Sequence, residues 1–204
     1  DPDAKPQSGI SFLLIDMKTP GITVRPIITL EGGHEVNEVF FDEVRVPQRY
    51  RIGAEGAGFI YQMQQFQEER LWCAASSLEP MDNCIAQTIE WAQQRRMFGA
   101  TLADQQWVQF KLAELKTEVE ALRALTYRAC DLYVNGQDVL ELASMAKLKA
   151  GRLNREVPDT CLQFWGGMGF TLENKVSRMY RDARVQRIYA GTNEIMKLLI
   201  ARSL

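Results

Sequence analysis

Four short segments of the sequence combine glycine or charged side chains in spacings that suit chemistry. They read RIYAGTNEIMK at 187–197, GGMGF at 166–170, RRMFG at 95–99 and EERL at 68–71. Glycine turns bring backbone N–H donors close to an oxyanion, and arginine offers fixed donors to phosphate. A positioned glutamate is able to accept a proton from a reacting group. These residue types raise the question of which ligand binds at these segments and which residue, if any, does chemistry there.

Each segment taken alone also has an ordinary structural interpretation. The glycines at 166–169 follow a predicted helix, so they suit a helix C-cap and argue against a dinucleotide-binding loop, which follows a strand. Arginines at 95–96 are favourable near a helix C-terminus without any ligand. The charges at 68–70 suit an exposed helix face. Single segments therefore leave both interpretations open.

Composition excludes several classes of function. The chain has 24 basic and 26 acidic residues and a formal net charge of −2, so no overall field draws it to nucleic acid or acidic lipid. Four cysteines without a CxxC spacing and a single histidine argue against a metal site and favour reduced, structural thiols. No apolar run approaches the roughly 20 residues of a membrane span. With 46% hydrophobic residues, the chain is expected to be globular.

The first part of the chain has the pattern of an antiparallel β segment. Runs rich in β-branched and aromatic residues, ISFLLID, GITVRPIITL and VNEVFFDEVRVP, lie between residues 10 and 47. Turn residues at 19–21 and 32–33 separate them. Three strands are too few to be stable alone, so the segment is expected to be part of a larger β-domain.

The remainder has the pattern of long helices. Apolar residues recur at helical spacing through 104–134 and 138–165, and Asn135-Gly136 is expected to end the first of these helices. A third helical segment covers about 58–97, where Pro80 is expected to kink or interrupt the helix.

The order of the segments carries a family resemblance. FFDEVRVP, EERL, RRMFG with ADQQ, QFWGGMGF and RDARVQRIYAGTNEIMKLLIAR follow one another from about residue 8 to 204, and this order closely resembles the C-terminal part of the flavin-dependent acyl-CoA dehydrogenases. The resemblance implies a mainly α fold with a C-terminal four-helix bundle, preceded by part of an antiparallel middle β-domain. Residues 1–53 would then belong to the β-domain and 54–204 to the bundle, and the family's N-terminal helical domain would be absent from this chain.

The resemblance also implies FAD as the cofactor, bound where subunits of a homo-dimer or homo-tetramer meet. The residues that match the family's FAD contacts are Arg95, Phe98, Gln106, Gln163, Gly167, Thr192 and Glu194.

The sequence departs from the commonest family pattern at Ala190. Many members have a glutamate there as the catalytic base, whereas a smaller group, which includes isovaleryl-CoA, long-chain and citronellyl-CoA dehydrogenases, uses the residue before the arginine of the ERL helix. In this chain that residue is Glu69, and Glu68 is its neighbour and competitor. Adjacent helical residues point about 100° apart, so only one of the two faces the site.

The same resemblance implies substrate contacts around the base. The backbone N–H of Ala190 would bind the thioester carbonyl beside Gly191, Tyr189 would line the acyl pocket, and Arg70 would hold the CoA portion or pair with a carboxylate.

The implied activity is oxidation of an acyl-CoA to the trans-2-enoyl-CoA in fatty acid β-oxidation, with electrons passing to an electron-transfer flavoprotein. A branched, isoprenoid or long acyl chain is the preferred substrate class. One alternative is a non-catalytic partner subunit that binds FAD or CoA, which the missing carboxylate at Ala190 favours. Another is an acyl-CoA oxidase or flavin monooxygenase on the same scaffold. The sequence does not distinguish a bacterial cytoplasm from a mitochondrial matrix.

Overall fold

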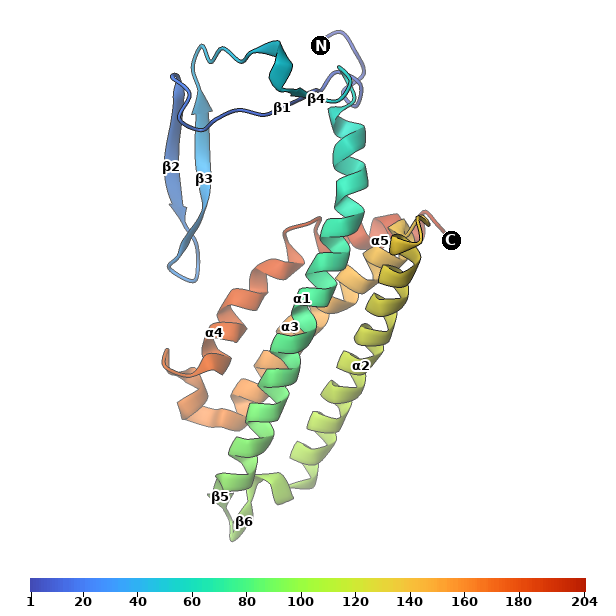
Figure 1. Cartoon of the computed structure of the whole chain (residues 1–204). Coiled ribbons are helices and arrows are strands. Elements are labelled where there is room, and N and C mark those ends of the chain that lie inside the picture. The colour runs from blue at the N-terminus through green and yellow to red at the C-terminus, as the bar shows by residue number, and fades with distance from the viewer. The chain divides into compact units, whose positions relative to one another are not determined.

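The computed structural model describes all residues from 1 to 204, and these form two compact units, residues 1–66 and 67–204 (Figure 1). Helix α1, Gly58–Gln94, begins in the first unit and continues into the second. The division between residues 53 and 54 stays a prediction.

The first unit is built around one β-hairpin. Strands β2, Ile22–Ile28, and β3, His34–Phe41, pair antiparallel, with Ile22 opposite Phe41. The turn between them passes through Gly32, whose positive φ of 81° suits glycine. The two-residue strands β1, Phe12–Leu13, and β4, Arg51–Ile52, form a second antiparallel pair, and a 3₁₀ turn, Gln48–Tyr50, precedes β4. The first predicted strand is therefore much shorter than its apolar run, and β4 was not predicted.

The second unit is helical. After α1 come α2, Gln106–Val134; α3, Leu140–Trp165; α4, Lys175–Asp182; and α5, Asn193–Ala201. A small hairpin of β5, Arg96–Met97, and β6, Ala100–Thr101, joins α1 to the 3₁₀ turn Leu102–Asp104 before α2. Two further 3₁₀ segments, Gly166–Phe170 and Ala183–Arg187, flank α4. Helix α3 packs against α2, α4 and α5, so it is the central helix of the unit.

The predicted ends of α2 and α3 are confirmed. Asn135 caps α2, and the following Gly136 has a φ of 73°. Gly166 caps α3 with φ 61° and ψ −142°, a combination that is essentially restricted to glycine. Of the two outcomes expected at Pro80, the interruption is wrong, because α1 runs through this residue, and the kink stays a prediction. Proline removes one backbone hydrogen bond, and the buried residues before and after Pro80 keep both halves of α1 in the core.

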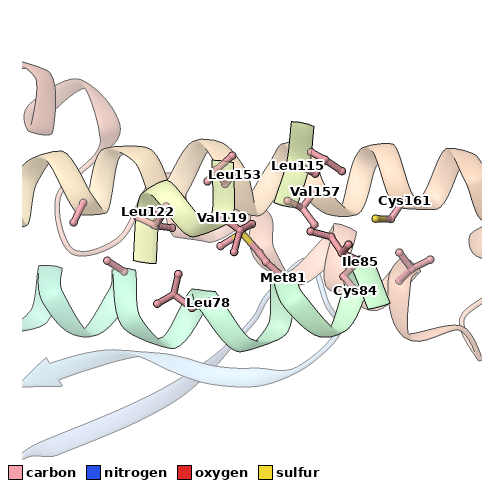
Figure 2. Packing of buried hydrophobic residues seen from close by; sticks show 14 residues of the cluster. Leu78, Met81, Cys84, Ile85, Leu115, Val119, Leu122, Leu153, Val157 and Cys161 are labelled. Carbon is pink, nitrogen blue, oxygen red and sulfur yellow. The ribbon is translucent and has the colours of Figure 1, made fainter. Parts of the chain in front are cut away.

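The core of the second unit lies between α1, α2 and α3 (Figure 2). Each helix contributes one apolar stripe, and the labelled members are Leu78, Met81, Cys84, Ile85, Leu115, Val119, Leu122, Leu153, Val157 and Cys161. The small residues Ala146 and Ala150 of α3 are fully buried as well, and they permit close helix packing. All four cysteines are free thiols, as the sequence predicted. No helix of the chain is both long and apolar enough to cross a bilayer.

Candidate active site

The first turns of α1 in the helical unit separate two neighbouring glutamates by environment. Glu68 is exposed, whereas Glu69 is half-buried and Arg70 is buried. Burial lowers the pKa of the Arg70 guanidinium, and the nearby Glu69 carboxylate acts in the opposite direction. The helical rotation of about 100° per residue explains the contrast between the glutamates. Of the two, only Glu69 is turned toward the packed side of the helix.

A strained turn precedes α5. Ala190 and Gly191 both have positive φ values, 53° and 86°, in a region that non-glycine residues seldom occupy. A β-carbon on Gly191 would lie 2.8 Å from Cε of Met196, so glycine is favoured there by packing as well as by φ. The hydroxyl of Thr192 then caps α5 by accepting a hydrogen bond from the N–H of Ile195 at 3.3 Å. The turn thus presents a defined backbone at the helix N-terminus.

The Glu194 side chain follows this cap in the first turn of α5, a favourable place for an anion. Hydrogen bonding to its own backbone N–H lowers the pKa of the Glu194 carboxyl.

Cys73 of α1 lies near both Glu69 and Tyr189, the residue before Ala190 in the strained turn. It lies one helical turn after Glu69 and is buried, and Lys147, Tyr189 and Glu69 are all near enough to influence the pKa of its thiol. Burial raises the pKa of the Cys73 thiol and raises the pKa of Tyr189 to about 12. Both groups are therefore uncharged at neutral pH. The structure brings Glu69 and the Tyr189–Gly191 turn to one place although they are far apart in the sequence.

A buried polar network fixes the segment before the turn. Gln186 donates a hydrogen bond from Nε2 to Oγ of Ser77 at 2.9 Å, and Asn154 donates one from Nδ2 to Oε1 of Gln186. The Ser77 hydroxyl in turn donates to the carbonyl of Cys73 at 2.6 Å. These bonds tie the 3₁₀ segment Ala183–Arg187 to α1 and α3, and buried networks that are fully paired rigidify their surroundings.

The opposite end of the helical unit holds a second group of predicted residues. At the tip of the β5–β6 hairpin, Phe98 has a φ of 50° and is 92% exposed, and Gly99 has a φ of 83°. Two successive positive φ values suit a two-residue hairpin turn. An exposed phenylalanine in this conformation gains nothing from packing within the chain. Gln106, also exposed, begins α2 beside the hairpin.

A cavity of about 630 Å³ lies beside this hairpin, where α1 and α3 end and α2 begins. Arg95, Gln163 and Gly167 line it together with tryptophan rings. Trp91 and Trp165 stack with ring centroids 4.6 Å apart, and the Trp165 indole donates a hydrogen bond to Oγ1 of Thr88 at 3.1 Å. The stacked pair gives the cavity a rigid aromatic wall.

The glycines at the end of α3 serve different purposes. Gly166 needs to be glycine because of its backbone conformation. Gly167 has no positive φ, and a β-carbon placed on it would meet nothing within 4 Å. Neither the backbone nor the packing of this chain therefore requires glycine at 167. The absence of a side chain at Gly167 leaves free space at the wall of the cavity.

The predicted site residues thus fall into two groups at opposite ends of the helical unit, near α5 and near the β5–β6 hairpin (Figure 1). The first group contains Glu69, Arg70, Tyr189, Ala190, Gly191, Thr192 and Glu194. The second contains Arg95, Phe98, Gln106, Gln163 and Gly167.

Comparison with known proteins decides the family. Residues 56–204, well over half of the chain, match the family model described as acyl-CoA dehydrogenase, C-terminal domain. The chain belongs to the acyl-CoA dehydrogenase family. The predicted family and fold class, a helical C-terminal domain preceded by antiparallel strands, are therefore confirmed.

Similar members of the acyl-CoA dehydrogenase family align along nearly the whole chain. The mitochondrial long-chain specific acyl-CoA dehydrogenase of Sus scrofa is 39% identical over 201 residues, which are 98% of this chain and 47% of that protein. The acyl-CoA dehydrogenase of Geobacillus kaustophilus superposes with a TM-score of 0.95 at 36% identity, covering 100% of this chain and 54% of its own. A structure of PigA with FAD and proline has a TM-score of 0.93 at 28% identity, covering 100% and 53%. The chain spans about half the length of the curated relatives it matches.

Sequence reasoning missed two residues of this candidate site. Cys73 carried no signal, because a lone cysteine in a helix is ordinarily core. Lys147 carried a usable one, since it stands among the small residues of the buried α3 stripe, between Ala143 and Ala150. A charged residue on such a face predicts a buried polar partner.

Proposed function

We propose that the protein carrying this chain is an FAD-dependent acyl-CoA dehydrogenase in which Glu69 is the base that removes the α-proton of the acyl thioester. The observation that carries the proposal is the meeting of the half-buried Glu69 with the Tyr189–Gly191 turn around Cys73. Membership of the acyl-CoA dehydrogenase family supplies the reaction class.

The turn has the means to bind a carbonyl but lacks a base. Ala190 carries only a methyl group, so no carboxylate projects from the turn. Its backbone N–H remains, and a hydrogen-bond donor aimed at the thioester oxygen stabilises the negative charge that develops when the α-proton leaves. The nearest carboxylate on the packed side of α1 is Glu69, because Glu68 faces solvent. The geometry therefore favours a carbonyl held by the turn and a proton taken by α1.

Other side chains define the surroundings of the thioester. Tyr189 stays a neutral phenol because its pKa is raised to about 12, so it offers a ring and a hydroxyl without a competing charge. Arg70, buried next to Glu69, is the cation for the CoA portion or for a carboxylate of the site.

The residues at the hairpin end fit FAD. The exposed Arg95 offers donors for phosphate oxygens, Gln163 offers an amide, and the open wall at Gly167 allows backbone N–H groups to approach closely. The exposed Phe98 and Gln106 lie beside the same cavity, and Thr192 and Glu194 at the turn complete the proposed FAD contacts. When bound, FAD supplies the acceptor for the hydride that leaves the β-carbon, giving the trans-2-enoyl-CoA.

The two groups of FAD contacts favour a homo-oligomer. About two thirds of α1 lies between Glu69 and its last residue, Gln94, and at 1.5 Å per residue this part is roughly 38 Å long. We infer that one FAD does not reach both groups of contacts within a single copy. One FAD is therefore bound by the turn before α5 of one copy and by the β5–β6 hairpin end of another copy, as in a homo-dimer or a homo-tetramer.

Substrate and electron acceptor follow from the relatives. The similarity to a long-chain specific dehydrogenase, together with a base on α1, favours a long or branched acyl-CoA over a short one. A relative named as a subunit of a caffeyl-CoA reductase-Etf complex supports an electron-transfer flavoprotein as the acceptor. The rival function is a partner subunit that binds FAD or CoA without catalysis, which Ala190 would suit.

The test uses the full natural protein that contains this chain, purified and mixed with acyl-CoA thioesters of graded chain length without oxygen. We expect bound FAD, an oligomer, and rapid loss of the absorbance of oxidised flavin with slow recovery in air. Fast recovery in air would identify an oxidase instead. A yellow protein that no acyl-CoA bleaches would contradict the proposal and favour the non-catalytic subunit.

A further inference from the structure

A lysine is buried in the central helix directly behind the strained turn. Lys147 lies in the middle of α3 with only 1% of its surface exposed. Its ammonium donates one hydrogen bond to the carbonyl of Gly191 and a longer one, 3.5 Å, to Oδ1 of Asn193. No carboxylate forms a salt bridge with it, although Glu194 lies within electrostatic range. Both hydrogen bonds of this cation therefore go to the segment that starts α5.

The second contact between α3 and the turn lies one helical turn further on. A β-carbon on Gly151 would lie 2.7 Å from Oδ1 of Asn193, so the absence of a side chain lets the start of α5 approach the helix. Lys147 and Gly151 are four residues apart and share one face of α3. Lys147 hydrogen-bonds to the turn, and Gly151 leaves space for Asn193 at the start of α5.

Packing alone does not explain the lysine. Removing an ammonium from water is costly, and an apolar side chain of similar volume commonly stabilises a core as well or better. Burial and the nearby Arg70 both lower the pKa of Lys147, while Cys73 and Glu194 act in the opposite direction. The turn it contacts contains two residues with positive φ, and such a conformation persists only when the surroundings determine it.

We propose that Lys147 is a positioning residue that, with the room left by Gly151, holds the Ala190–Gly191 turn so that the N–H of Ala190 meets the thioester carbonyl. This role rests on the proposed function. The lysine acts through the turn and touches neither substrate nor flavin. Its loss is expected to misplace the Ala190 donor, which matters more for the developing negative charge than for ground-state binding.

The experiment compares Lys147→Met with Lys149→Met in the full natural protein. Lys149 is on the same helix, but its ammonium is at the surface and pairs with Glu118. We expect Lys147→Met to lower kcat about 10- to 100-fold with less than about a threefold change in KM, since only a transition-state contact is weakened. Lys149→Met should match the wild type. Amide hydrogen exchange in residues 190–193 should speed up in Lys147→Met while exchange in the middle of α2 stays unchanged.

A second variant keeps the test decisive if Lys147→Met folds poorly. Gly151→Ala retains the lysine but pushes Asn193 away, and it should produce the same separation of kcat from KM and the same local increase in exchange. Wild-type kcat and unchanged exchange at 190–193 in a folded Lys147→Met protein would overturn the proposal. A uniform rise in exchange across α1, α2 and α3 would show a merely structural lysine. If none of the acyl-CoA thioesters reduces the flavin of the wild-type protein, the proposed function fails. The exchange data then still show whether Lys147 holds the turn.

Discussion

Replacing Gly166 and Gly167 separately by alanine distinguishes a glycine required by the fold from one required by a ligand. In Gly166→Ala, the alanine must adopt φ 61° with ψ −142°, a backbone conformation that costs about 1–3 kcal/mol for a residue with a β-carbon. In Gly167→Ala, the new β-carbon meets nothing within 4 Å. Reduced freedom of the unfolded chain should then stabilise the protein by about 0.4–1 kcal/mol.

These free energies predict opposite shifts in thermal stability. At about 2–4 °C per kcal/mol for a unit of this size, Gly166→Ala should lower Tm of the FAD-free protein by roughly 2–12 °C, and Gly167→Ala should raise it by roughly 1–4 °C. Affinity for FAD should follow a different order. In Gly167→Ala the methyl group fills the opening in the cavity wall, and we expect FAD to bind at least about tenfold more weakly, equivalent to about 1.4 kcal/mol.

The assay combines thermal unfolding of FAD-free protein with titration of FAD by fluorescence. A destabilised Gly167→Ala protein would show that the fold itself needs this glycine. A folded Gly167→Ala protein with wild-type affinity for FAD would refute the inference that the opening at Gly167 receives the cofactor.

Two further predictions concern charge. Arg95→Gln should weaken FAD binding about 10- to 100-fold, because charge-assisted hydrogen bonds contribute about 1.5–3 kcal/mol. Arg96→Gln, at the adjacent exposed arginine, should change FAD affinity little. Equal losses of FAD affinity in the two variants would indicate non-specific electrostatic attraction. Tyr189 has a folded-state pKa of about 12, above the ordinary value of 10, so the stability that its burial contributes is complete below pH 10 and is lost as the pH rises toward 12. Urea unfolding between pH 9 and about 12 should show this part of the decline in wild type and not in Tyr189→Phe, and identical declines would contradict the assignment.

The helices could be predicted from the sequence because their burial is one-sided. The apolar stripes of α2 and α3 recur at the helical period, and Gly136 and Gly166 supply the backbone conformations that end them. The two-residue pairs β1–β4 and β5–β6 could not be predicted. They are too short to have a period, and in the second pair the turn at Phe98 and Gly99 determines the structure.

The site could be predicted as a set of segments but not as an arrangement. The family resemblance of EERL and RIYAGTNE implied a base and a carbonyl-binding turn, and in the structure Glu69 and Tyr189 both lie near Cys73. The contacts that hold these two segments in place join residues far apart in the sequence, and a local sequence pattern does not reveal such contacts. Lys147 reaches a carbonyl 44 positions away in the sequence, and Asn154 meets Gln186 across 32 positions.

The most direct test of the account is the rate of flavin reduction by acyl-CoA in Glu69→Gln, measured without oxygen in the full natural protein beside Glu68→Gln. Glutamine keeps the size and polarity of the side chain but cannot accept the proton. We predict a rate about 10²–10⁴-fold below wild type in Glu69→Gln, the range typical of a lost general base, with substrate binding little altered. Glu68→Gln should react like the wild type. A Glu69→Gln protein that reduces its flavin at the wild-type rate would contradict the assignment of the base to α1.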